Sequence, residues 1–145
     1  MKYLSILFLA GLISCQQVSQ KTDTKKDILA VLMDQQLAWN EGNIEKYMFG
    51  YLQSDSLRFA SGGNHSYGWH ITLERYKAGY PDNQKMGKLT FSEIDIKLLS
   101  ADYALVFGKW ELERETDNPW GLFTLIFKRT LKGWRIVHDH TSSGS

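Results

Sequence analysis

The sequence predicts an α+β domain in which a curved antiparallel sheet wraps around N-terminal helices. Helical periodicity is confined to the first half of the chain, and long strand-like segments follow one another in the second half. The 145 residues, 43% of them hydrophobic, suit one domain with one core. A long sheet on so small a domain curls and leaves a concave side that side chains or a ligand must fill.

Each expected helix has a start or stop signal in the sequence. The segment 24–27 (Thr-Lys-Lys-Asp) resembles a capping box, and apolar residues at helical spacing follow it as far as Trp39. Gly42 is a good helix stop and Asn43 a good N-cap for a second helix. A third helix is expected over residues 69–78.

Strands are expected at residues 57–61, 88–99, 101–114, 120–131 and 134–141. A bulge is expected near Glu93, where the alternation of apolar and polar residues is imperfect. The 101–114 strand has one apolar face, made of Ala104, Val106, Gly108, Trp110 and Leu112.

The N-terminus reads as an export signal. Lys2 precedes an apolar run over residues 3–13, which is shorter than the ~20 residues that a membrane-spanning helix needs. The segment 12–15 (Leu-Ile-Ser-Cys) resembles the bacterial lipobox, which implies cleavage before Cys15 and lipid attachment to it. An ordinary secretory signal with an incidental cysteine is the alternative. A lipoprotein is therefore expected in the cell envelope, anchored to a membrane on its periplasmic or extracellular face.

The expected domain organisation follows from this signal. Residues 1–14 form the signal peptide, the polar residues 15–23 a flexible tether, and residues 24–143 the folded domain. The net charge of +1 and the scattered lysines and arginines give no basic stripe, so no nucleic-acid partner is expected. No phosphate-binding loop, Cys–His cluster or nucleophile elbow occurs, and no cofactor is expected.

Several segments resemble a known family. The runs 39–43 (Trp-Asn-Glu-Gly-Asn) and 57–60 (Leu-Arg-Phe-Ala), with Tyr51 and Gly68, resemble the opening of the SnoaL-like and ketosteroid-isomerase-like branch of the nuclear transport factor 2 superfamily. The run 133–142 is similar to the ending of small bacterial members of this superfamily and of the association domain of calcium/calmodulin-dependent kinase. The resemblance covers about residues 24–143.

This resemblance implies a cone-shaped fold with an interior pocket, usually in a homodimer. It does not imply one activity, because members include isomerases, hydratases, hydrolases and oligomerisation domains. The leading hypothesis is a lipid-anchored domain that binds a small, mostly apolar molecule. The alternatives are an enzyme of the isomerase, hydratase or hydrolase type, and a non-catalytic interaction module.

His138 and His140 are the candidate catalytic residues. They lie two apart on a strand and are expected to share the inward face of Trp134 and Ile136, with Asp139 pointing away. Imidazole titrates near neutral pH, so either could act as an acid or base, or both could serve as structural hydrogen-bonding groups. No metal site is expected, because no spacing supplies a third ligand.

Aromatic residues are the candidate ligand-binding residues, with plain core packing as the alternative. They are Trp39, Tyr47, Tyr51, Phe59, Trp110 and Trp120. The acids and phenol of steroid isomerases are missing, since their positions fall near Gln35, near Ala60 or Ser61, and on an acid-free strand at 120–129. Steroid isomerisation is therefore not expected. Arg58 is expected to be exposed or salt-bridged on its strand.

Overall fold

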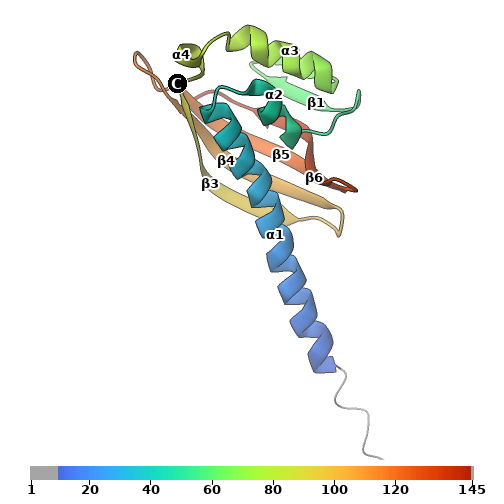
Figure 1. Ribbon diagram of the computed structural model, residues 1–145. Coiled ribbons are helices and arrows are strands. Elements are labelled where there is room, and N and C mark those ends of the chain that lie inside the picture. The colour runs from blue at the N-terminus through green and yellow to red at the C-terminus, as the bar shows by residue number, and fades with distance from the viewer. Residues whose placement is uncertain (1–9, 145) are drawn as a thin grey trace, which may run out of the picture.

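The computed structural model describes residues 10–144, with side chains from residue 23 onward, and confirms the α+β fold (Figure 1). The helices are α1 (Ala10–Asn40), α2 (Ile44–Tyr47), the 3-10 turn η1 (Met48–Gly50), α3 (Trp69–Gly79) and α4 (Asn83–Met86). The strands are β1 (Arg58–Ser61), β2 (Asn64–Tyr67), β3 (Lys88–Leu98), β4 (Tyr103–Glu113), β5 (Trp120–Thr130) and β6 (Gly133–Thr141).

The strands form one sheet in the order β2-β1-β6-β5-β4-β3. All neighbours pair antiparallel except β1 and β6, which run parallel, so the sheet departs from the expected arrangement at one pairing. The expected bulge in β3 is confirmed, because Glu93 has a φ of 54° and the register shifts between Ser92 and Asp95. The helices cover one face of the curved sheet (Figure 1).

Helix α1 begins at Ala10, well before the predicted start at residue 24. Residues 15–23 therefore continue the helix where the sequence predicted a flexible tether. Their three glutamines and one lysine favour helix, and no Gly or Pro interrupts them. Figure 1 shows this part of α1 extending beyond the domain. The predicted signal peptide lies mostly outside the described residues, as does the side chain of Cys15.

The C-terminal half of α1 is fixed to the sheet by its apolar face and by two amide side chains. Ile28 and Leu32 are fully buried in the core. On the edge strand β3, the backbone N–H of Leu89 donates to Asn40 Oδ1 at 2.7 Å, and that of Phe91 donates to Gln36 Oε1 at 2.7 Å. These bonds occupy backbone donors that an edge strand would otherwise leave open.

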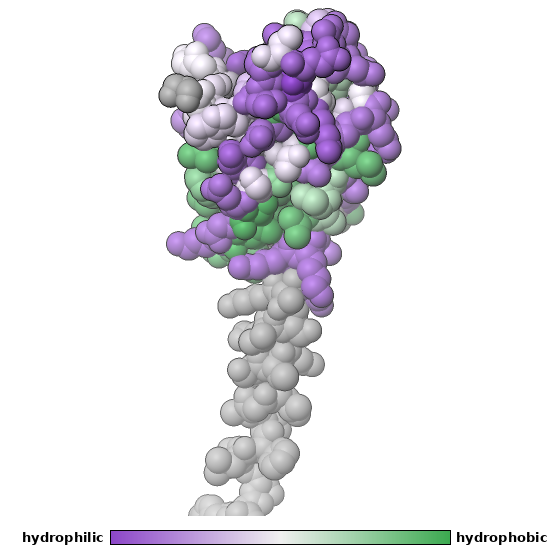
Figure 2. Space-filling model, turned by 90° about the vertical axis from the view of Figure 1, so that its left-hand side faces the viewer, coloured by the Kyte–Doolittle hydropathy of each residue, from purple (hydrophilic) through white to green (hydrophobic). Residues whose placement is uncertain are grey.

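Apolar surface gathers on the lower part of the domain, near the point where α1 leaves it, and hydrophilic surface covers the opposite end (Figure 2). On α1 itself, Leu29, Met33 and Leu37 are exposed at a spacing of four residues. This spacing places them on one side of the helix. Among residues 10–144, no helix has both the length and the apolar character needed to cross a membrane.

Candidate functional site

A cavity of about 360 Å³ lies between the sheet and the helices. Its volume falls within the range of small-molecule sites, and its walls are mostly apolar. Aliphatic and aromatic residues from α1 and from strands β3 to β6 form these walls, among them Leu32, Leu89, Phe91, Leu112, Phe123, Leu125 and Ile136. The cavity occupies the concave side that the sequence predicted would need filling.

The cavity includes five of the six aromatic candidates in its lining: Trp39, Tyr47, Tyr51, Phe59 and Trp110. Trp120 is absent from it and is 39% exposed, with Lys109 Nζ 5.1 Å from its ring centroid. Trp120 faces outward because it alternates with the buried Gly121 at the start of β5. Ligand binding by the other five stays a prediction.

The expected orientation of the two histidines is wrong. Strand β6 contains a bulge that the sequence analysis missed: Ile126 pairs with His138, but its neighbour Phe127 pairs with Ile136, which leaves Val137 without a partner. One extra residue reverses the alternation of faces for the rest of a strand. Trp134 and Ile136 face inward before the bulge, and Asp139 and Thr141 face inward after it. Both histidines therefore lie on the outer face.

On that outer face His138 contacts the neighbouring strand. Arg58 Nε donates to His138 Nδ1 at 2.8 Å, so the imidazole accepts in its neutral form. Partial burial lowers the pKa of His138, and the nearby charges of Arg58 and His140 lower it further. Arg58 is exposed, as expected, and so is His140. Neither histidine lines the cavity.

Asp139 is the buried carboxyl of the cavity, with 3% of its surface exposed. Tyr51 Oη donates to its Oδ2 at 2.7 Å, and Thr141 Oγ1 donates to its Oδ1 at 3.1 Å. Burial raises the pKa of Asp139 to about 6, although the two hydroxyls and the charges of His140 and Arg75 act in the opposite direction. The side chain can therefore accept or release a proton near neutral pH.

Three tyrosine hydroxyls meet beside this carboxyl. Tyr76 Oη lies 3.3 Å from Tyr51 Oη and 3.4 Å from Tyr47 Oη. Burial raises the pKa of all three phenols, and the negative charge of Asp139 adds to the effect. They therefore stay protonated at neutral pH and act as hydrogen-bond donors toward Asp139 or toward a ligand.

Helix α3 supplies a cation to the same space. The guanidinium carbon of Arg75 lies 4.8 Å from the centroid of the Phe59 ring, and Arg75 Nη2 donates to the Ser61 carbonyl at 3.4 Å. No carboxylate among the described residues lies within 4.0 Å of this guanidinium. Arg75 therefore retains donors that can reach a ligand.

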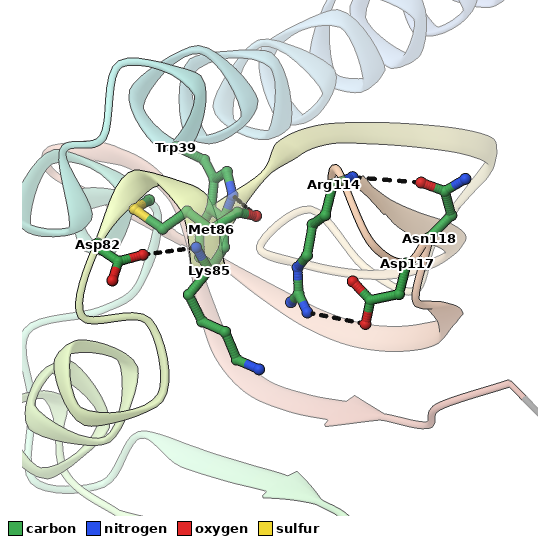
Figure 3. A network of polar contacts seen from close by, with 7 residues as sticks. All are labelled: Trp39, Asp82, Lys85, Met86, Arg114, Asp117 and Asn118. Carbon is green, nitrogen blue, oxygen red and sulfur yellow. Dashed lines mark hydrogen bonds and ion pairs between the residues drawn. The ribbon is translucent and has the colours of Figure 1, made fainter.

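Two further cations line the cavity (Figure 3). Lys85 comes from α4, whose N-cap Asp82 accepts the Lys85 backbone N–H at 2.7 Å. Arg114 follows β4, where its backbone N–H donates to Asn118 Oδ1 at 3.3 Å. The ends of both side chains extend to the same side in Figure 3.

The sequence did not reveal that Asp139, Arg75 and Lys85 line the cavity, and the reasons differ. Asp139 was assigned to the outer face because the bulge at Val137 leaves no clear mark in the sequence. Arg75 and Lys85 lie on helices, where cations are usually exposed to solvent. Only the packing of these helices against the sheet places them at the cavity. Within the described residues, no three His, Cys, Asp or Glu side chains cluster so that they could hold a metal ion.

Comparison with known proteins agrees with this architecture. Residues 28–144 match the model of the SnoaL-like domain family. An NTF2-like protein of unknown function from Shewanella oneidensis MR-1 is 42% identical, covers 81% of this chain and 98% of its own, and superposes with a TM-score of 0.78. No curated protein matches the chain.

Two more distant structures share the fold alone. One is a ketosteroid isomerase-like protein from Erwinia carotovora atroseptica SCRI1043, at 19% identity, 81% and 94% coverage and a TM-score of 0.64. The other is an NTF2-like superfamily protein from Salmonella enterica Typhimurium LT2, at 18% identity, 86% and 94% coverage and a TM-score of 0.69. The resemblance predicted from the sequence is confirmed, and the chain belongs to the SnoaL-like domain family.

Proposed function

We propose that this domain binds a small, mostly apolar molecule in the cavity between its sheet and its helices. One observation carries the proposal: an apolar cavity of about 360 Å³ that encloses a hydrogen-bonded carboxyl. An apolar wall with few polar groups is the usual composition of a small-molecule site. The alternative, a non-catalytic interaction module, predicts a cone filled by side chains. It has less support because the cone contains a cavity of about 360 Å³.

The test uses a neutral aromatic probe, 1-naphthaleneacetamide, with the full chain. Saturable quenching of tryptophan fluorescence is expected, because Trp39 and Trp110 line the cavity. A Trp120→Phe variant should retain the same affinity, since Trp120 lies outside. Absence of saturable binding, together with native mass spectra that show no retained small molecule, would contradict the proposal.

An enzyme is the second candidate, and the observation that favours it is the environment of Asp139. A carboxyl with a pKa of about 6, bonded to a phenol and facing a cavity, meets the requirement for a general acid or base. Turnover would then belong to the isomerase, hydratase or hydrolase class, with Asp139 in the role that the sequence suggested for His138 or His140. Replacing Asp139 by Asn would abolish it, and replacing both histidines by Ala would leave it unchanged.

We also propose that the domain is a lipoprotein tethered to a membrane of the cell envelope through Cys15. The support is the sequence at residues 1–15. In the native host, Cys15→Ala should accumulate as a precursor without lipid, detectable by intact mass and by membrane fractionation. Normal processing of that variant would refute the lipobox interpretation.

A homodimer remains part of the proposal. The outer face of the sheet supports it, because Phe107 and Leu122 are exposed there on adjacent strands. Placing a charge at both positions, as Phe107→Glu with Leu122→Lys, should yield a monomer in analytical ultracentrifugation. A wild-type chain that sediments as a monomer at micromolar concentration would refute this part.

A further inference from the structure

The side chains that line the cavity carry more positive than negative charge. This excess indicates the chemical class of the ligand, an inference that rests on the proposed function. Among the described residues, three cationic side chains line the cavity, Arg75, Lys85 and Arg114, but only one acidic side chain does, Asp139. The walls between them are mostly apolar, and a less polar surrounding strengthens the field of each charge. The cavity therefore favours an anion over a neutral molecule of the same shape.

Among these cations, Arg114 gives the strongest indication of an anionic ligand. Its side chain is only 10% exposed, and its Nε is buried without a hydrogen-bond partner. The single polar contact of its guanidinium with the described residues is Arg114 Nη1 to Asp117 Oδ2 at 3.5 Å, and Asp117 is 56% exposed. A buried donor without an acceptor is costly, and no described residue accepts from Arg114 Nε, so this nitrogen is available to a ligand.

The backbone brings the end of α4, the helix that carries Lys85, against Arg114. Gly87, which follows α4, has a φ of 62°, and a Cβ built there would lie 2.6 Å from Arg114 Cγ and 2.6 Å from the Glu113 carbonyl oxygen. Only glycine fits between the end of α4 and the end of β4 at this distance. Lys85 lies two residues before it, and no carboxylate of the described residues lies within 4.0 Å of its ammonium (Figure 3).

Tyr80 lines the cavity within the electrostatic influence of both Arg114 and Arg75. Both arginines act on the Tyr80 phenol, where they oppose the rise in its pKa that burial causes. Tyr80 lies against Trp39, with ring centroids 4.7 Å apart, and lines the cavity. No hydrogen bond occupies its hydroxyl among the described residues. An acid group bound near Lys85 and Arg114 would thus meet a neutral donor as well as cations.

We propose that the cavity's ligand is an organic anion: its apolar body lies among the aromatic residues, and its acid group binds between Lys85 and Arg114. A carboxylate and a phosphate monoester share this chemistry, because both accept hydrogen bonds from a guanidinium and an ammonium. Asp139 and the three tyrosines then face another part of the same molecule.

The experiment compares matched naphthalene probes on the full chain by isothermal titration calorimetry. The probes are 1-naphthaleneacetate, 1-naphthyl phosphate and the neutral 1-naphthaleneacetamide. At least one anion should bind about tenfold or more tightly than the amide, as a charge-assisted hydrogen bond predicts. Tighter binding of the acetate identifies a carboxylate site, and tighter binding of the phosphate identifies a phosphate site.

Two variants locate the effect. Arg114→Gln and Lys85→Gln should each remove most of the preference for the anion, measured in each variant as the ratio of anion affinity to amide affinity. Lys97→Gln, an exposed residue of β3 outside the cavity, is the control for a change in net charge. Lys85 is exposed, so its variant does not put folding at risk even if Arg114→Gln unfolds.

The outcomes separate this inference from the proposed function. If the amide binds as tightly as both anions, the inference is overturned while the cavity remains a binding site. If the preference persists in Lys85→Gln and Arg114→Gln, or falls equally in Lys97→Gln, the assignment to this pair is overturned. If none of the three probes binds, the proposed function and the inference fail together.

Discussion

Two polar regions line one cavity, and they differ in how fully their hydrogen bonds are satisfied. Both carboxylate oxygens of Asp139 accept a hydroxyl, from Tyr51 and from Thr141. In contrast, Arg114 leaves a buried nitrogen without an acceptor, and Lys85 has no carboxylate within 4.0 Å among the described residues. The hydrogen bonds of Asp139 are satisfied by neighbouring side chains of the protein. Among the described residues, none accepts a hydrogen bond from Arg114 Nε, which is therefore available to a ligand.

The largest expected effect concerns the charge of Asp139. Its pKa is 3.8 in the unfolded chain and about 6 in the folded protein, so between these pH values only the folded state holds the proton. Stability should therefore fall as pH rises from about 4 to about 6 and level off above that range. Asp139→Asn should lose this decline and exceed the wild type at pH 7 by up to about 3 kcal/mol.

Urea unfolding at several pH values measures this difference directly. Asn can keep the bond from Tyr51, so the comparison isolates the charge rather than the geometry. Asp95→Asn, on β3 outside the cavity, serves as the matched control for the loss of one carboxylate. A wild-type stability that rises between pH 4 and pH 6 in step with the Asn variant would contradict the assigned burial of the charge.

Removing a donor from the Asp139 region should be costly. Tyr51→Phe deletes the hydroxyl that lies 2.7 Å from Asp139 Oδ2 and leaves a buried acceptor unpaired. We expect a loss of about 1–3 kcal/mol in the free energy of unfolding. The matched control is Tyr67→Phe, an exposed residue of β2. Equal stability of the two variants would show that the bond between Tyr51 and Asp139 contributes nothing.

Removing a donor from the Arg114 region should not destabilise the protein. Arg114→Met keeps the packing of the aliphatic stem and deletes a buried nitrogen that has no partner. The free energy of unfolding of the unliganded protein should not fall and should rise by up to about 1–3 kcal/mol, because the variant removes an unpaired buried donor and loses only a long contact with an exposed carboxylate. A loss above 2 kcal/mol, on the order of a broken buried hydrogen bond, would mean that Arg114 already has an acceptor.

The smallest effect is expected on the outer face of the sheet. Replacing His138 and His140 together by Ala should leave probe affinity unchanged, because neither lines the cavity. Calorimetric titration of the double variant with 1-naphthaleneacetate measures this. A large loss of affinity with intact stability would restore the histidines as site residues and contradict the inward position of Asp139.

The sequence predicted the long helices and strands and one bulge, and it missed two short elements and a second bulge. Alternation over residues 101–114 and 120–131 identified β4 and β5, and Asn43 marked the start of α2 because its side chain caps that helix. The bulge in β3 was foreseen, since a charged residue breaks an apolar alternation at Glu93. The short elements β2 and α4 were missed because each consists of four mostly polar residues, which give no apolar pattern to detect.

The candidate site was harder to predict because one residue decides it. Val137 lies in a strand of mixed polar and apolar residues, so the sequence does not mark it as the extra residue, yet its bulge places Asp139 instead of the histidines on the inner face. The aromatic lining was easier, since Trp39 and Trp110 follow helix and strand spacing. The approach of α4 to Arg114 depends on the close contact at Gly87, which only the folded chain brings about.

The indole N–H signals of the five tryptophans give the most direct test that this cavity is the ligand site. Trp39 and Trp110 line it, whereas Trp120 lies on the outer surface. In two-dimensional nitrogen–proton NMR spectra, titration with 1-naphthaleneacetate should shift the Trp39 and Trp110 signals and leave Trp120 unchanged. Shifts confined to Trp120, or saturation without any shift at Trp39 and Trp110, would place the ligand elsewhere and contradict the account.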